Sequence, residues 1–126
     1  MFSVRVRDSI MIAHSLPDTF FGPAANMHGA TYVVDAEFKS SVLDRHNVVI
    51  DIGMAHQVLK QVLSELNYKN LDELPQFKGH LTTTEYIAQH IHNQISGALT
   101  GKFEGTIKIT LGESHVAWAS FEESVG

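Results

Sequence analysis

Alternating apolar and polar residues predict four β-strands, two near each end of the chain. Residues 2–13 carry apolar side chains at every second position and arginines between them, which is the two-residue period of a half-buried strand. The same alternation runs through residues 28–39, 106–113 and 115–122. Residues 48–52 read VVIDI, which suits either a short additional strand or an extended connection.

The middle of the chain has the spacing of amphipathic helices. From about Gly53 to Leu66, apolar residues recur at i, i+3, i+4 and i+7, with polar residues largely opposite. A second helix begins within residues 82–95, and glycine-containing or polar segments at 67–80 and 96–105 predict loops. Strands followed by helices and then by strands predict an α+β fold, in which both helices cover one face of a four-stranded antiparallel sheet.

Composition narrows the possible functions. A length of 126 residues suits a single domain, 1–126, with a real core. A net charge of −5 argues against nucleic-acid binding, which needs clustered Lys and Arg. No apolar run is long enough to span a membrane, and Arg5, Arg7 and Asp8 interrupt the start of the chain as a signal peptide, so we expect a cytoplasmic location. The absence of cysteine excludes disulfides and a cysteine nucleophile.

Eight histidines are many for this length, and three of them are candidates for a site. His14 ends the first predicted strand and His28 begins the second, so antiparallel pairing would bring them together. Such histidines are more often surface or hydrogen-bonded structural residues when taken alone. His115 lies two residues after Glu113 and would share its face if one strand ran through both.

Two glutamates also stand out, each with a structural alternative. Glu85 follows Thr82 by three residues, which fits a helix capping box. Glu113 lies between apolar segments, and a partly buried carboxylate needs hydrogen-bond donors. A ligand with an amide or guanidine edge would supply such donors.

At this point the chain resembles the 6-pyruvoyl-tetrahydropterin synthase and 6-carboxytetrahydropterin synthase family over nearly its whole length. IMIAHSL resembles the first zinc-histidine segment, and FFGPAANMHGATY the segment with the nucleophilic cysteine and His-Gly-His. VVIDIGMAHQVLKQVL resembles the family's strand and first helix, and LNYKNLDELPQF its Asp-His-x-Asn-Leu loop. TTTEYIAQHI and LGESHVAWASFE resemble the two glutamate segments that hold the pterin ring.

The resemblance implies the tunnelling fold, in which trimers close their sheets into a barrel and often stack as hexamers with sites between subunits. It also implies action on a pterin such as dihydroneopterin triphosphate. In the family, three histidines hold zinc, a cysteine assisted by an Asp-His pair moves a proton, and a glutamate anchors the pterin. Carried onto this chain, the metal residues are His14 and His28, and the ring-binding residues are Glu113, Glu85 and Thr84.

The chain departs from this pattern where the chemistry is expected. Ala24 occupies the cysteine position, Ala30 the third zinc histidine, and Asn67-Tyr68 the Asp-His pair. Because alanine neither takes a proton nor ligates zinc, we expect any zinc site to need another ligand, for which His115 is the candidate.

Three interpretations follow. The first is an enzyme with altered chemistry on a pterin or related bicyclic substrate, in which His28, Tyr68 or His115 transfers protons. The second is a non-catalytic pterin- or purine-binding protein, and the third is an assembly that keeps only the fold. The first is favoured because the histidines would have little use in the second, and because the retained glutamates argue against the third.

Overall fold

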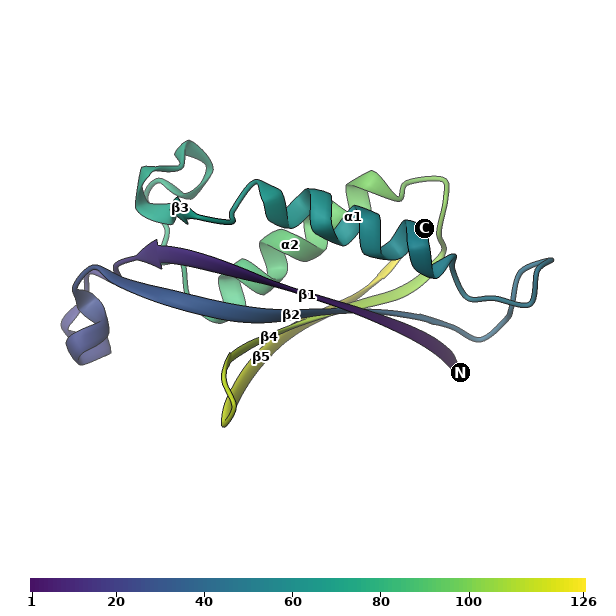
Figure 1. The fold of residues 1–126 in the computed structure, drawn as a ribbon, viewed down its shortest axis with the longest axis horizontal. Helices are drawn as coiled ribbons and strands as arrows, with labels where there is room; N and C mark the ends of the chain where they lie inside the picture. Colours follow the sequence, from purple (N-terminus) through teal and green to yellow (C-terminus); the bar gives the residue numbers. More distant parts are fainter.

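The computed structural model describes all 126 residues and contains one five-stranded sheet with the order β3-β1-β2-β4-β5. Both helices lie over the same face of this sheet (Figure 1). The α+β prediction is therefore confirmed, with five strands rather than four. The strands are β1 (Phe2–His14), β2 (His28–Ser40), β3 (Lys69–Asn70), β4 (Gly105–Ser114) and β5 (Ala117–Val125).

The long β1–β2 hairpin forms the centre of the sheet. Its antiparallel register runs from Phe2 opposite Ser40 to His14 opposite His28 without interruption. Alternate residues of β1, β2 and β4 point toward the helices and are buried, as the sequence pattern predicts. They include Ile10, Tyr32, Val34, Phe38, Ile107, Ile109 and Leu111.

The helices contribute the other half of the core. α1 (Ile52–Ser64) buries Ala55, Leu59 and Leu63. α2 (Thr84–Ala98) buries an apolar stripe together with His92. Neither helix is long and apolar enough to cross a lipid bilayer.

The N-cap of α2 differs from the prediction. The Thr83 hydroxyl accepts a hydrogen bond from the Tyr86 amide at 3.2 Å, so Thr83 is the cap. The predicted capping box of Thr82 and Glu85 is wrong by one residue. Because α2 begins one position later, the Thr82 side chain is free to point toward β1 instead.

Residues 48–51 form no strand, so of the two alternatives left open for this segment the connection holds, and Asp51 caps α1 by accepting from the Met54 amide at 2.7 Å. Two further segments differ from the sequence prediction. The predicted loop 67–80 contains β3, which runs parallel to β1, and two 3-10 turns, Leu71–Glu73 and Pro75–Phe77. β5 begins at Ala117 rather than at residue 115, because residues 115 and 116 form the turn after β4.

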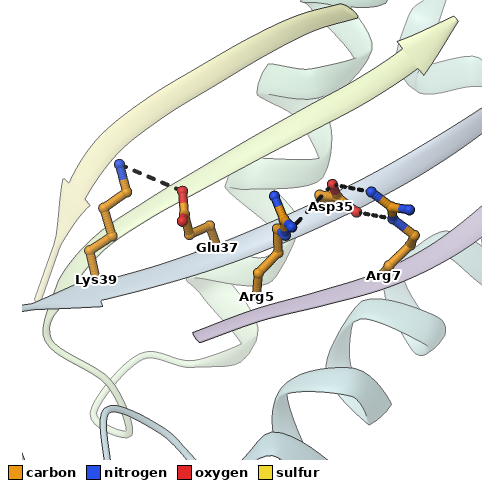
Figure 2. Close-up of polar contacts among 5 residues, drawn as sticks. All are labelled: Arg5, Arg7, Asp35, Glu37 and Lys39. Atoms are coloured by element: carbon orange, nitrogen blue, oxygen red, sulfur yellow. Dashed lines mark hydrogen bonds and ion pairs between the residues drawn. The ribbon is translucent and has the colours of Figure 1, made fainter. Parts of the chain in front are cut away.

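The sheet face away from the helices carries a ladder of charged side chains on β1 and β2 (Figure 2). Arg7 binds both carboxylate oxygens of Asp35, with Nε–Oδ1 at 2.6 Å and Nη2–Oδ2 at 3.0 Å. Lys39 lies 3.7 Å from Glu37 and 2.8 Å from Glu122 on β5. Exposed pairs of this kind contribute only about 0–1 kcal/mol each, so they add little to stability.

Candidate functional site

His14 and His28 meet at one end of the central hairpin. They are direct cross-strand partners, and their ring centroids lie 4.6 Å apart with an interplanar angle of 66°. Both side chains are on the helix-facing side of the sheet, where His14 is buried and His28 is half-buried. The sheet register thus places two imidazoles side by side at the edge of the core.

Hydrogen bonds orient both rings. His28 Nδ1 lies 2.8 Å from the Asn26 carbonyl oxygen. Because a carbonyl can only accept, Nδ1 carries the proton and the neutral ring keeps its lone pair on Nε2. His14 Nδ1 lies 3.0 Å from the Thr82 hydroxyl. This hydroxyl is available because Thr83, not Thr82, caps α2.

Burial lowers the pKa of His14, and the neighbouring His28 lowers it further. The Thr82 contact and the Asp72 and Glu113 carboxylates oppose this shift without reversing it. His14 is therefore neutral at neutral pH and has a lone pair available for a proton or a metal ion.

These residues do not make a complete zinc site within one chain. Catalytic zinc is usually held by three protein ligands, but residue 30, which follows His28 on the same strand face, is alanine. No group of three His, Cys, Asp or Glu side chains is arranged to hold a metal ion. The two imidazole nitrogens are suitable ligands, and the third would have to come from elsewhere.

His115 is not brought to the histidine pair. The expectation that it shares a strand face with Glu113 is wrong, because β4 ends at Ser114 and His115 lies in the exposed β4–β5 turn. The structure therefore gives no support within one subunit for His115 as a metal ligand or a proton donor to this site.

Glu113, Thr84 and Glu85 line a small pocket, and Glu113 is exposed there, so the expectation of a partly buried carboxylate is wrong. The Thr84 hydroxyl donates to Glu113 Oε1 at 3.3 Å. The pocket has a volume of about 150 Å³, and its remaining lining residues are Ala117, Trp118 and Ala119. Ligand pockets usually measure about 300–1,000 Å³, so this one accepts one edge of a bicyclic ring. A larger hollow of about 550 Å³ surrounds Phe103 at the C-terminal end of α2, but it contains no histidine.

A β-bulge aims Glu113 at this pocket. The pairing of β4 with β5 shifts between Gly112 and Ser114, which leaves Glu113 unpaired, and bulges commonly redirect a side chain in this way. Gly112 leaves room for the Trp118 ring, since a Cβ at residue 112 would lie 3.0 Å from Trp118 Cδ1 and Nε1.

Sequence reasoning missed Tyr32 and Thr82. Tyr32 is fully buried, and its hydroxyl makes no hydrogen bond. Burial raises the pKa of Tyr32, the nearby Thr84 hydroxyl offsets part of this, and the Glu113 and Glu85 carboxylates raise it further. Its strand position predicts only a core residue, and no sequence signal showed that its hydroxyl would lie beneath a carboxylate.

Tyr68 is held at the edge of β1, apart from the pocket. Asn67 Oδ1 accepts from the Met11 amide at 3.0 Å, and the Tyr68 amide donates to the Met11 carbonyl at 2.7 Å. Tyr68 has a φ of 60° and a side chain that is 79% exposed. It forms no hydrogen bond with either histidine, so its catalytic role stays a prediction.

Comparisons with known proteins show the family to which this fold belongs. Residues 3–124 match the family model described as 6-pyruvoyl tetrahydropterin synthase. A curated 6-pyruvoyl tetrahydrobiopterin synthase of Dictyostelium discoideum is 32% identical over 81 residues, which span 63% of this chain and 60% of that protein. The chain thus matches less than two thirds of that relative's length.

Solved structures share the fold. The 6-pyruvoyl tetrahydropterin synthase of Caenorhabditis elegans superposes with a TM-score of 0.81 at 21% identity, covering 99% of this chain and 96% of that one. A catalytic-residue variant of the Plasmodium vivax 6-pyruvoyltetrahydropterin synthase has a TM-score of 0.77 at 17% identity, covering 98% of each chain.

Proposed function

The chain belongs to the 6-pyruvoyl tetrahydropterin synthase family, and we propose that it binds the ring of a pterin or related bicyclic substrate at Glu113 and acts on it with altered chemistry. The observation that carries the proposal is the Glu113–Thr84 pair in a small pocket that fits one edge of a ring. A carboxylate of this kind accepts two adjacent N–H groups of a 2-amino-4-oxo ring in a bidentate way.

The histidine pair supplies the groups that would transfer protons to or from the bound substrate. Glu113 has the smallest influence among the groups that affect the pKa of His14, and in this proposal a ring held by Glu113 extends its substituent toward the two imidazoles. His28 Nε2 keeps a lone pair in the neutral ring, so this nitrogen can accept a proton from a bound substrate. In this proposal His28 is the proton-transfer residue, and Tyr68 is a second candidate.

One set of observations favours a second candidate, a non-catalytic ring-binding protein. Ala24, Ala30 and Asn67 replace three groups that the family resemblance assigns to chemistry. Such a protein would keep the Glu113 pocket and use the histidines only to hydrogen-bond the ligand.

Titration with neopterin tests ring binding, using ligand fluorescence or calorimetry. Glu113→Gln removes the charge that the N–H groups need and should weaken binding by roughly 1.5–3 kcal/mol. Glu104→Gln, in the segment between α2 and β4 and outside this pocket, is the matched control and should bind as the wild type does. An unchanged affinity in Glu113→Gln would remove Glu113 as the anchor.

Product analysis separates the two candidates. Dihydroneopterin derivatives incubated with the protein should be converted, and His28→Ala should abolish conversion while ring binding persists. Quantitative recovery of unchanged ligand from a protein that binds it would establish the non-catalytic candidate instead.

A further inference from the structure

The Tyr32 hydroxyl is the one buried oxygen near the pocket that the mechanism above does not use. Its atom is inaccessible to solvent, and the Thr84 hydroxyl, although near enough to lower the pKa of Tyr32, does not meet it with hydrogen-bond geometry. Buried polar groups are seldom left in this state, because losing hydration without gaining a partner is costly. Phenylalanine would fill the same space without this cost. We therefore expect a neighbouring group to use the Tyr32 hydroxyl.

The sheet register shows which neighbours these are. The last β2–β4 pair before the bulge is Val33 opposite Gly112, so the next step along the strands sets Tyr32 beside Glu113. Both side chains leave the sheet on the side that faces α2. Thr84, the first residue of α2, lies next to the Tyr32 hydroxyl and donates to Glu113.

We propose that Tyr32 is a positioning residue of the ring pocket: its hydroxyl donates to Thr84 Oγ1, and Thr84 in turn donates to the Glu113 carboxylate while Glu113 holds a ring with two adjacent N–H donors. This inference rests on the proposed function of Glu113. A threonine hydroxyl has one hydrogen and can accept as well as donate. A donor behind it fixes that hydrogen on Glu113 and so fixes the carboxylate in the plane that the ring requires.

This series of hydrogen bonds, still incomplete without the ring, explains why the Thr84–Glu113 contact is long in the free protein. At 3.3 Å it exceeds the usual 2.5–3.0 Å of an O–H···O bond. A small side-chain rotation of Glu113 when the ring binds would shorten it, and rotation of the Tyr32 hydroxyl would direct its hydrogen at Thr84 Oγ1. Hydrogen bonds arranged in series strengthen one another.

Four variants test the proposal by neopterin affinity and thermal unfolding. Tyr32→Phe removes one oxygen from an otherwise filled site and should weaken binding roughly tenfold. Its melting temperature should not fall, because the lost hydroxyl is unpaired in the free protein. Thr84→Val, which keeps the shape without the hydroxyl, should weaken binding similarly, and Thr84→Ser should restore it. The Tyr32→Phe/Thr84→Val double variant should bind neopterin no more weakly than the single variant of lower affinity. Both substitutions interrupt the same series of hydrogen bonds.

Wild-type affinity in Tyr32→Phe would overturn the proposal, and so would losses that multiply in the double variant. If Glu113→Gln weakens binding and Tyr32→Phe does not, the ring pocket stands and only the role of Tyr32 fails. If neither the wild type nor any variant binds neopterin, the proposed function itself fails. If Tyr32→Phe lowers the melting temperature, the Thr84→Val and Thr84→Ser pair decides, and equal affinity in those two would also overturn the proposal.

Discussion

Asn67 stands where the family resemblance places an aspartate, and the structure shows what it does there. Its side-chain oxygen accepts from the Met11 amide at the exposed edge of β1. A carboxamide occupied in this way organises the start of β3 and takes no part in proton transfer. Ala24, at the cysteine position, contributes only its carbonyl, which accepts from the Leu16 amide at 3.1 Å.

These residues lead to the first prediction. The purified protein should convert dihydroneopterin triphosphate to the 6-pyruvoyl product very slowly or not at all, because loss of a catalytic base commonly costs 10²–10⁴-fold in rate. Chromatographic product analysis beside an authentic synthase measures this. Ordinary turnover would contradict the reading of Ala24 and Asn67 as losses.

A second prediction concerns Ala30. Ala30→His would place a third imidazole two residues after His28 on the same strand face, and should raise zinc affinity at least tenfold over the wild type. Elemental analysis after dialysis against zinc measures the occupancy. The same change in a His14→Ala background should give no gain, and equal occupancy in the wild type and Ala30→His would place any zinc elsewhere.

The sequence could predict some residues of the site and not others, for identifiable reasons. His14 and His28 were found because two strand ends joined by one loop must meet. Tyr32 was missed because alternation reports which face a side chain occupies and says nothing about its terminal atom. His115 was misplaced because alternation continues through a tight turn whose two residues have no period of their own.

At the scale of elements, the caps of the helices decide which threonine is available to the site. Thr83→Ala removes the hydroxyl that accepts from the Tyr86 amide and should lower the free energy of unfolding by about 0.5–2 kcal/mol. Chemical denaturation followed by circular dichroism measures it. An unchanged free energy of unfolding in Thr83→Ala would contradict the assignment of Thr83 as the N-cap.

α2 also carries a histidine whose burial makes stability depend on pH. His90 packs against Phe77 with ring centroids 4.8 Å apart, and burial lowers its pKa below 6.5. The unfolded chain therefore binds a proton at a higher pH than the native protein does. This contribution to stability is complete above pH 6.5 and declines as the pH falls from there toward the lower native pKa.

His90→Leu keeps the apolar contact and cannot titrate, so it should flatten the decline below pH 6.5. Denaturant unfolding at several pH values between about 5 and 8 measures the effect. His115→Leu, in the exposed turn, is the matched control and should keep the wild-type slope. Parallel curves for the wild type and His90→Leu would exclude His90 as a source of the dependence.

Most elements could be predicted because they are long enough to show a period. β1, β2, α1 and α2 each repeat their pattern several times. β3 has two residues, Lys69 and Asn70, and no periodicity can reveal a strand of that length. It exists because Asn67 and Tyr68 bond the backbone of Met11, which is a long-range contact.

For the whole molecule, the small pocket and the unpaired sheet edges both indicate an oligomer. A pocket of about 150 Å³ encloses too little of a bicyclic ring, and β5 leaves a nine-residue edge without a partner. Closure of several sheets into a barrel would pair such edges. We therefore predict a trimer or hexamer, with a neighbouring subunit completing each pocket.

Light scattering coupled to size exclusion measures this directly. The mass should be three or six times the 14.0 kDa of the chain at micromolar concentration, and ring binding should weaken under conditions that dissociate the assembly. A monomer that binds neopterin with full affinity would show that one chain supplies the whole pocket.

The charged ladder on the open face has a consequence for how the hairpin avoids mispairing. A slip of one residue would turn every core side chain outward, so the slips that could compete shift β1 by two residues and keep its faces. In the native register Arg7 faces Asp35 and Arg5 faces Glu37. A two-residue slip in one direction sets Arg7 against Glu37 but Arg5 against Lys39, and in the other it sets Arg5 against Asp35 but Arg7 against Val33, so each slip loses one of the two pairs. The same shift would move His14 away from His28, to face Ala30 or to leave the hairpin's last pair. The charged ladder, which includes neither histidine, therefore favours the alignment that brings the two histidines together.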